Sequence, residues 1–237
     1  NDKNIKLPSS DWSYGPWRIA TSGEIPLDNP NQITIDSFSR IKLKDNNNHS
    51  LDFKFKLQIS IVDRGLLTGN LNANLDLKSF PLSSLSAIGQ TSISGKLTAS
   101  GDIEGPLSSL NTNIGISLDN PQLNGLRLRE KWVGTFKRLP EKKNWGSLKM
   151  NSESAYIPGN LSLNLTKGGR INDLIFKRLG GEITLRSQSE LFEWQANQFR
   201  LDRLEVAIPP EKSFKRIFGQ ATGKGVFSLN PLFVDGQ

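Results

Sequence analysis

The sequence predicts an all-β protein folded as an elongated antiparallel meander, in which neighbouring strands are joined by short turns. Three observations support this fold class. Apolar and polar side chains alternate over long stretches, turn-forming residues separate these stretches, and helical periodicity is scarce. Successive side chains of a strand point to opposite faces, so each alternating stretch builds a sheet with one aliphatic and one hydrated face.

Two stretches show the alternation most clearly. From Leu67 to Lys78 the odd positions carry Leu, Gly or Ala, and the even positions carry Thr, Asn, Asp or Lys. The same pattern returns from Ile93 to Glu104. Shorter or less regular versions of this period follow at 53–61, 110–118, 161–165, 181–185 and 201–208. We therefore expect a long series of half-buried strands.

Turn chemistry falls between these stretches, as at Asn124-Gly125. We expect one or two short helices, at 81–85 and at 210–218, where Pro210 suits a first turn and Gly219 an end. His49 stands in a run of polar residues, and we expect it at the tip of a loop.

The chain shows no internal linker, so we expect 1–237 to be undivided. It opens without a methionine and ends directly after a strand-like segment, so we expect it to be one piece of a longer repetitive β-sheet protein. The charged segment 137–144 lies between two strand-like segments that each begin with tryptophan, which predicts a long hairpin loop. A weak internal repeat of strand, coil and glycine-spaced strand suggests sub-repeats at 66–136 and 194–230.

Composition argues against an enzyme. The chain has no cysteine, which excludes thiol catalysis, disulfides and cysteine-ligated zinc. One histidine, His49, argues against a Ser-His-Asp triad and against a multi-histidine metal site. Carboxylates such as Asp76, Asp102, Glu104 and Glu182 fall on the hydrated sides of strands rather than in an apolar pocket. We expect no catalytic residue, no metal and no cofactor.

The 237 residues carry a net charge of +7, which weakly favours an anionic partner such as a phospholipid surface or nucleic acid. The basic residues are spread along the chain rather than gathered in one strip, so we expect no nucleic acid. No apolar stretch approaches the ~18 residues that a membrane-spanning helix needs. We therefore expect no membrane span within this sequence.

Glycines interrupt the aliphatic sides of the strands at Gly69, Gly95, Gly101, Gly223 and Gly225. Glycine in a strand marks a bulge, a bend or a close approach of another group. Two interpretations remain open: a strongly curved sheet that folds over its own core, and a sheet curled around a long open groove.

The segment from Ile93 to Leu110, ISGKLTASGDIEGPLSSL, resembles the glycine-spaced strand units of TamB-like proteins in the AsmA-like superfamily. Its continuation from Leu118 to Gly125 fits as well, and the similarity is nearest to the cyanobacterial branch, which includes a chloroplast inner-envelope relative linked to protein import. The resemblance covers 66–136 and returns at 194–230.

The resemblance implies a half-pipe, or β-taco, with an apolar inner face. It further implies a protein anchored in the inner membrane that crosses the periplasm, or the chloroplast intermembrane space. Such a bridge would carry lipids and support outer-membrane protein biogenesis with an Omp85-type barrel.

Our first hypothesis is thus a non-enzymatic lipid conduit whose inner face contacts phospholipid acyl chains. Each methylene moved from water to an apolar wall gains about 0.8 kcal/mol, so tails need no polar anchor. The aliphatic positions of the alternating strands supply the candidate lining residues: Leu71, Leu75, Ile93, Leu97, Ile103, Ile114, Ile116, Leu161, Leu163 and Leu165. For each of them, ordinary core packing is the competing interpretation.

Two other hypotheses remain. A closed β-sandwich or β-solenoid would act as an adhesin or carbohydrate-binding module, with Trp12, Trp17, Trp132 and Trp145 exposed to stack on sugars. A scaffold segment would dock an Omp85-type barrel by strand addition at a sheet edge, which is compatible with lipid transport.

Overall fold

The computed structural model describes the backbone of most of the chain. The described residues are 4–14, 17–26, 32–43, 46–62, 66–85, 92–138, 145–154, 156–167, 169–188, 191–202, 204–208, 213–229 and 232–236. Side chains are described at 69–83, 92–138, 145–154, 156–167, 169–188, 191–202, 204–206, 215–228 and 236.

Within the described residues, eighteen strands form one sheet, accompanied by one 3-10 turn and no α-helix. The elements of the first half are β1 (Asn4–Tyr14), β2 (Trp17–Pro26), β3 (Gln32–Leu43), β4 (Asn46–Val62), β5 (Leu66–Pro81), η1 (Leu82–Leu85), β6 (Ile93–Pro106), β7 (Asn111–Leu123) and β8 (Leu126–Arg127). Those of the second half are β9 (Trp132–Arg138), β10 (Gly146–Ser152), β11 (Gly159–Leu165), β12 (Ile171–Arg178), β13 (Gly181–Gln188), β14 (Leu191–Arg200), β15 (Leu204–Ile208), β16 (Ser213–Ile217), β17 (Gln220–Leu229) and β18 (Leu232–Gly236).

The sheet follows chain order for most of its length. Each strand from β1 to β7 pairs antiparallel with the next, and so does each strand from β9 to β14. β9 joins β7 directly, and β17 joins β14 and is followed by β18. The bypassed strands form a flap, in which β8 pairs with β7 and β15, and β15 pairs with β16.

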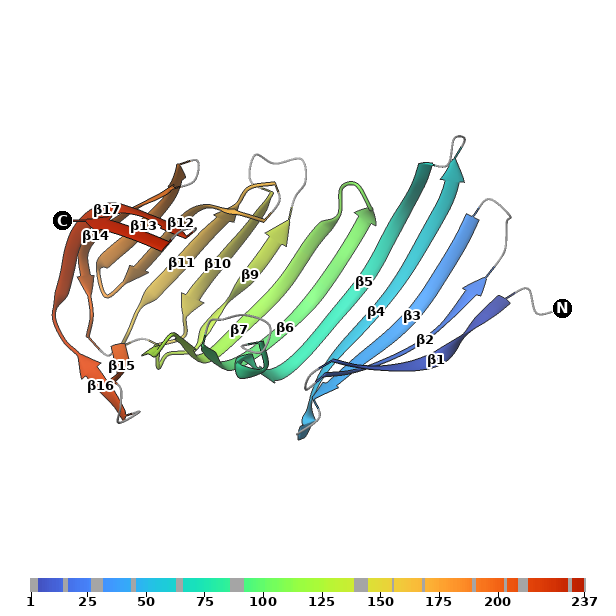
Figure 1. The fold of residues 1–237 in the computed structure, drawn as a ribbon, viewed down its shortest axis with the longest axis horizontal. Coiled ribbons are helices and arrows are strands. Elements are labelled where there is room, and N and C mark those ends of the chain that lie inside the picture. The colour runs from blue at the N-terminus through green and yellow to red at the C-terminus, as the bar shows by residue number, and fades with distance from the viewer. Residues whose placement is uncertain are drawn as a thin grey trace.

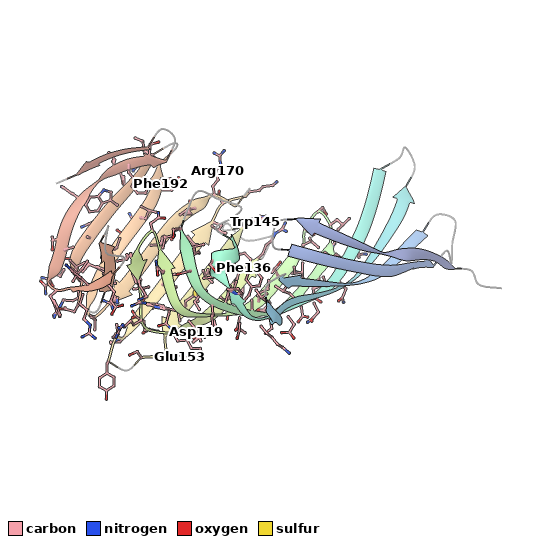
Figure 2. All side chains as sticks on the ribbon, turned by 60° about the horizontal axis from the view of Figure 1, so that its bottom comes forward. Asp119, Phe136, Trp145, Glu153, Arg170 and Phe192 are labelled. Carbon is pink, nitrogen blue, oxygen red and sulfur yellow. The ribbon has the colours of Figure 1, made fainter. Side chains whose placement is uncertain are left out.

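The strands end at two rims (Figure 1). We call the rim with η1 and the flap the lower rim, because it lies at the bottom of Figure 1. The opposite, upper rim carries the turns between β6 and β7 and between β11 and β12. Figure 2 separates Arg170, on the upper rim, from Asp119 and Glu153, on the lower rim.

One face of the sheet is apolar, as the alternation predicts. On β5 the side chains of Ala73 and Leu77 are buried, whereas those of Asn72 and Asn74 are exposed. Cross-strand pairing places Ala99 of β6 beside Leu77, so this aliphatic face continues from strand to strand.

The aliphatic face is the concave one in the second half of the sheet. β9 and β12 are separated by β10 and β11, so three strand spacings of ~4.8 Å would hold them about 14 Å apart in a flat sheet. Nevertheless, the rings of Trp132 on β9 and Phe176 on β12 have centroids only 5.5 Å apart. The side chains converge because the sheet curls around them. The expected all-β, strongly curved sheet is therefore confirmed.

Two local expectations were wrong. Within the helix expected at 210–218, Ser213–Ile217 forms β16 instead, whose backbone pairs with β15, and this pairing overrides the local helix signals. Residues 210–212 lie outside the described residues. His49 lies within β4 rather than at a loop tip, because the pairing of β3 with β4 continues past a bulge as far as Asn46. The segment 81–85 does coil, as the 3-10 turn η1, and the tryptophan-flanked hairpin is β9–β10, with its loop 139–144 outside the described residues.

The segments 66–136 and 194–230 share one local feature. A bulge follows Leu77 in β5 and Ala196 in β14, with Ser79 and Gln198 both at a φ of 46°. In each bulge the backbone N–H of that residue donates to a threonine hydroxyl on the neighbouring strand over 3.2 Å. The division into sub-repeats stays a prediction, with which this matched pair of bulges is consistent.

Candidate functional site

Two continuous apolar rows cross the aliphatic face from β5 to β17. Their members pair directly from one strand to the next, and each member is apolar or glycine. Row A consists of Leu77, Ala99, Ile116, Gly134, Met150, Leu161, Phe176, Ile183, Ala196 and Gly223. Row B, one step nearer the upper rim, consists of Leu75, Gly101, Ile114, Phe136, Leu148, Leu163, Leu174, Leu185, Trp194 and Gly225.

The two rows differ in burial. Row A includes fully buried side chains, among them Leu77, Ala99 and Met150. Every member of row B is only half-buried. Side chains of this size on a concave face retain exposure only where the remaining chain does not cover them. Row B is thus the more exposed part of the aliphatic face, which we call the trough, and row A is its more buried margin.

All ten predicted lining residues are half-buried. Five of them belong to the two rows: Leu75, Ile114, Ile116, Leu161 and Leu163. Leu71, Leu97, Ile103 and Leu165 stand beside the rows on the same face. Ile93 lies beyond the bulge between Ser94 and Lys96 and pairs with Leu123, which is 54% exposed, so the continuous pairing of the rows does not reach it.

Core packing accounts for part of the predicted set. Leu97, Ile114 and Ile116 pack against the buried cluster of Leu77, Phe80 and Ala99. Leu82 of η1, 5% exposed, belongs to the same lower-rim end of β5 and β6. This end of the aliphatic face is consequently packed by the chain itself, and Ile114 of row B takes part in that packing. The row B positions on β10 to β13 are half-buried.

Sequence reasoning missed most of row B beyond β7, where Leu163 alone was predicted. Phe136, Leu148, Leu174 and Leu185 were not among the expected lining residues. Their alternation is short or interrupted, as at Ile175 between Leu174 and Phe176, so no single strand reveals the face. Pairing with the neighbouring strands reveals it.

Close backbone approach explains one of the glycines. A Cβ at Gly101 would collide with the carbonyl oxygen of Asn113 and the Cα of Ile114 on β7. Gly95 instead has a φ of 115° and stands at the bulge between β6 and β7. Both positions thus serve the bending and close pairing of the sheet.

The lower end of the trough is closed by aromatic packing. Phe176 contacts Trp132 at 5.5 Å and Phe199 at 5.3 Å between ring centroids. Trp132 is only 3% exposed, which corrects the expectation that it is free to stack on a sugar. The side chains of Trp12 and Trp17 lie outside the described residues.

A buried ion pair completes this closure. The Nε of Arg178 donates to Glu130 over 2.9 Å, and both side chains are fully buried. Arg178 Nη1 also donates to the backbone oxygens of Asp202 and Arg200, at 2.7 and 3.3 Å. The guanidinium therefore ties β12 to the segment that follows β14.

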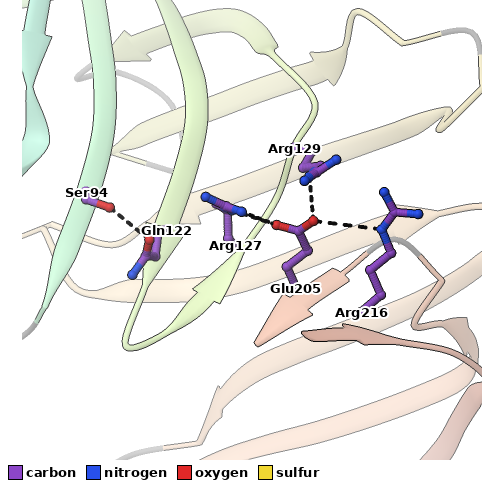
Figure 3. Close-up of polar contacts among 6 residues, drawn as sticks. All are labelled: Ser94, Gln122, Arg127, Arg129, Glu205 and Arg216. Carbon is purple, nitrogen blue, oxygen red and sulfur yellow. Dashed lines mark hydrogen bonds and ion pairs between the residues drawn. The ribbon is translucent and has the colours of Figure 1, made fainter. Parts of the chain in front are cut away.

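The flap is held by a second buried carboxylate (Figure 3). Glu205 of β15 accepts from Arg127 of β8 over 2.8 Å and lies 2.5 Å from Arg129 and 3.9 Å from Arg216. Burial by itself raises the pKa of Glu205, but the three guanidinium groups outweigh it and hold the pKa below its ordinary value. Glu205 is therefore ionised at neutral pH and offsets part of the positive charge of the three arginines around it.

One cation stands on the aliphatic face near the upper rim. Arg138 is paired with Thr112 on one side and Gly146 on the other, one step beyond row B. Its guanidinium carbon lies 4.4 Å from the centre of a Trp145 ring. Among the described residues, no carboxylate lies within ion-pairing distance of Arg138.

A hollow also lies mostly on the opposite, polar face, and Trp194 and Gly225 of row B contribute to its lining. It has a volume of about 730 Å³ over β13, β14 and β17. The side chains that give it a mixed charge are Glu182, Arg186, Glu193 and Lys224. None of the predicted lining residues belongs to it, and its charged lining does not suit an acyl chain.

Over the described residues, no group of three or more His, Cys, Asp or Glu side chains is placed to hold a metal ion. Within the same part of the chain, no helix has the length and apolar character needed to cross a membrane. No protein-family model matches the chain, and no curated protein matches it either.

Proposed function

We propose that this chain is a non-enzymatic lipid-binding segment, in which acyl chains lie on row B and the neighbouring aliphatic positions. The observation that carries the proposal is the unbroken run of half-buried apolar residues from β5 to β17 on the concave face. A tail with nothing to hydrogen-bond requires such a wall, at about 0.8 kcal/mol for each methylene removed from water.

The direction of the rows favours movement rather than fixed binding. The rows run across the strands, so a tail that shifts from β10 to β11 exchanges Leu148 for Leu163 and meets the same kind of surface. No hydrogen bond must break during such a step, because the contacts are non-directional. A surface of this kind suits a conduit better than a receptor for one lipid.

The wider setting is a proposal that depends on the resemblance to TamB-like proteins. In it, the chain is part of a bridge anchored in an inner membrane that crosses the periplasm, or the chloroplast intermembrane space. The bridge carries phospholipids and works with an Omp85-type barrel, which would dock by strand addition to an edge of the sheet.

The competing carbohydrate-binding function loses support from two described tryptophans. Trp132 is buried, and one face of Trp145 is covered by the guanidinium of Arg138. Sugar stacking needs an exposed aromatic face, which neither ring offers in full.

Native mass spectrometry of the purified chain tests the proposal. The variant Leu163→Asp places a carboxylate in row B, and Asn160→Asp places one at an exposed position of the same strand. We expect phospholipid to co-purify with the wild type and with Asn160→Asp, and to be lost from Leu163→Asp while the fold is retained. Absence of bound lipid from the folded wild type after expression in lipid-replete cells would contradict the proposal.

A further inference from the structure

We propose that Arg138 binds the negatively charged headgroup of the lipid whose tail lies in the trough, and so selects anionic lipids and fixes their orientation. This inference rests on the proposed function. It adds a ligand class, an amphiphile with an anionic head, and a residue that recognises it.

The first argument is position. Arg138 lies on the same face as Phe136, two residues along β9, and Phe136 belongs to row B. The neighbour of Arg138 on β10 is Gly146, and the ring of Phe136 and the side chain of Leu165 pack over this glycine. A cation is thus placed where row B ends toward the upper rim.

The second argument is charge. The described arginines of the lower rim have carboxylate partners: Arg127 and Arg129 contact Glu205, and Arg178 contacts Glu130. Arg138 has no such partner in the described part of the chain, and its Nε is shielded from solvent without a hydrogen bond. A partly desolvated, unpaired cation favours an anion beside it.

The third argument is presentation. The guanidinium lies over a Trp145 ring, with its carbon 4.4 Å from the ring centre, and this contact restrains the side chain. Its N–H groups lie along the edges of the planar guanidinium. Guanidinium groups pair with phosphate or carboxylate oxygens through such edges. Both headgroup types fit this chemistry.

The position of the lower plug gives the lipid its orientation. Arg138 lies six residue steps along β9 from the buried Trp132, a length of roughly 20 Å at ~3.3 Å per step. A tail that starts beside Arg138 therefore runs down the trough and ends against the aromatic plug. The headgroup faces the upper rim.

Binding of three probes to the purified chain tests this inference: phosphatidylglycerol, oleate and uncharged diacylglycerol. Arg138→Gln removes the charge, Arg138→Lys keeps it without the planar stack, and Lys137→Gln is the control on the exposed, opposite face. We expect Arg138→Gln to weaken binding of the anionic probes roughly tenfold or more, with diacylglycerol unchanged and Arg138→Lys intermediate. Loss with phosphatidylglycerol but not oleate identifies phosphate as the preferred head, and the reverse identifies carboxylate.

Each remaining outcome has a distinct meaning. Equal binding of anionic probes by the wild type and Arg138→Gln overturns the headgroup inference and leaves the apolar trough intact. Failure of all three probes to bind the wild type overturns the proposed function. Added salt provides a measurement on the unaltered chain: it should weaken binding of phosphatidylglycerol more than that of diacylglycerol, and equal weakening contradicts the role of Arg138.

Discussion

The rings of Trp132 and Phe176 lie 5.5 Å apart although two strands separate the strands that carry them. This contact, rather than any sequence pattern, reports the curvature of the sheet. It also packs the lower-rim end of the aliphatic face, next to the buried members of row A.

Removal of the Trp132 ring should destabilise the fold strongly. Trp132→Ala empties the site between Phe176 and the chain around Gly159, and we expect a loss of about 3–5 kcal/mol in the free energy of unfolding. Tyr156→Ala, at a residue that is 80% exposed, should change it by less than about 0.5 kcal/mol. Urea unfolding followed by circular dichroism measures both, and equal losses would show that Trp132 does not organise this end.

Leu97 and Leu163 should respond differently to the same substitution. Leu97 packs against the cluster of Leu77, Phe80 and Ala99, so Leu97→Asp should cost about 3 kcal/mol or more in stability. Leu163 belongs to the half-buried row B, so Leu163→Asp should cost clearly less and act mainly on lipid binding. Thermal unfolding and the lipid content of the two purified variants check this. A larger loss of stability for Leu163→Asp than for Leu97→Asp would place Leu163 in a closed core.

Acid should release the flap through Glu205. The folded-state pKa of this carboxyl lies below its ordinary value of 4.5, so the stabilisation is fully present above about pH 4.5 and is lost as the pH falls through the folded-state pKa. Glu205→Gln should lower the free energy of unfolding at pH 7 and make its decrease toward acid pH less steep. Part of the acid sensitivity should remain, because Asp202 also has a lowered pKa, caused by its hydrogen bond from Arg200. Melting temperatures between neutral and acid pH give the comparison, and an unchanged profile in Glu205→Gln would remove Glu205 from this role.

The pair of Arg178 and Glu130 should show strong coupling. Glu130→Gln leaves a fully buried guanidinium without its counter-charge, for which we expect a loss of about 3–5 kcal/mol. The double variant Glu130→Gln, Arg178→Met should lose clearly less than the sum of the losses of Glu130→Gln and Arg178→Met alone. A double-mutant cycle from denaturant unfolding tests this, and strict additivity would mean that the two charges act independently.

The sequence predicted the strands well where apolar and polar residues alternate within a single strand. The patterns at 67–78 and 93–104 correspond to β5 and β6, and the coil at 81–85 to η1. Local signals failed at 210–218, where pairing with β15 decides the conformation. The rows were predicted only in part, since Leu148 and Leu174 become neighbours of Leu163 through pairing across strands.

The position of Arg138 beside row B was also not predicted from the sequence. In the chain it follows Lys137 within a charged hairpin, and both residues look equally hydrated. The strand alternation of β9 places them on opposite faces, and only the stack on Trp145 distinguishes the arginine. Charge composition alone therefore could not identify Arg138, the one described cation that stands beside row B without a carboxylate partner.

Site-specific photocrosslinking to lipid tests the central claim most directly. A photoreactive residue at Leu148 stands in row B, and one at Lys149, the next residue of β10, stands on the opposite, exposed face. In membranes supplied with labelled phospholipid, we predict strong lipid adducts at position 148 and none above background at position 149. Equal labelling of the two positions, or labelling at position 149 alone, would contradict a lipid-bearing trough on the aliphatic face.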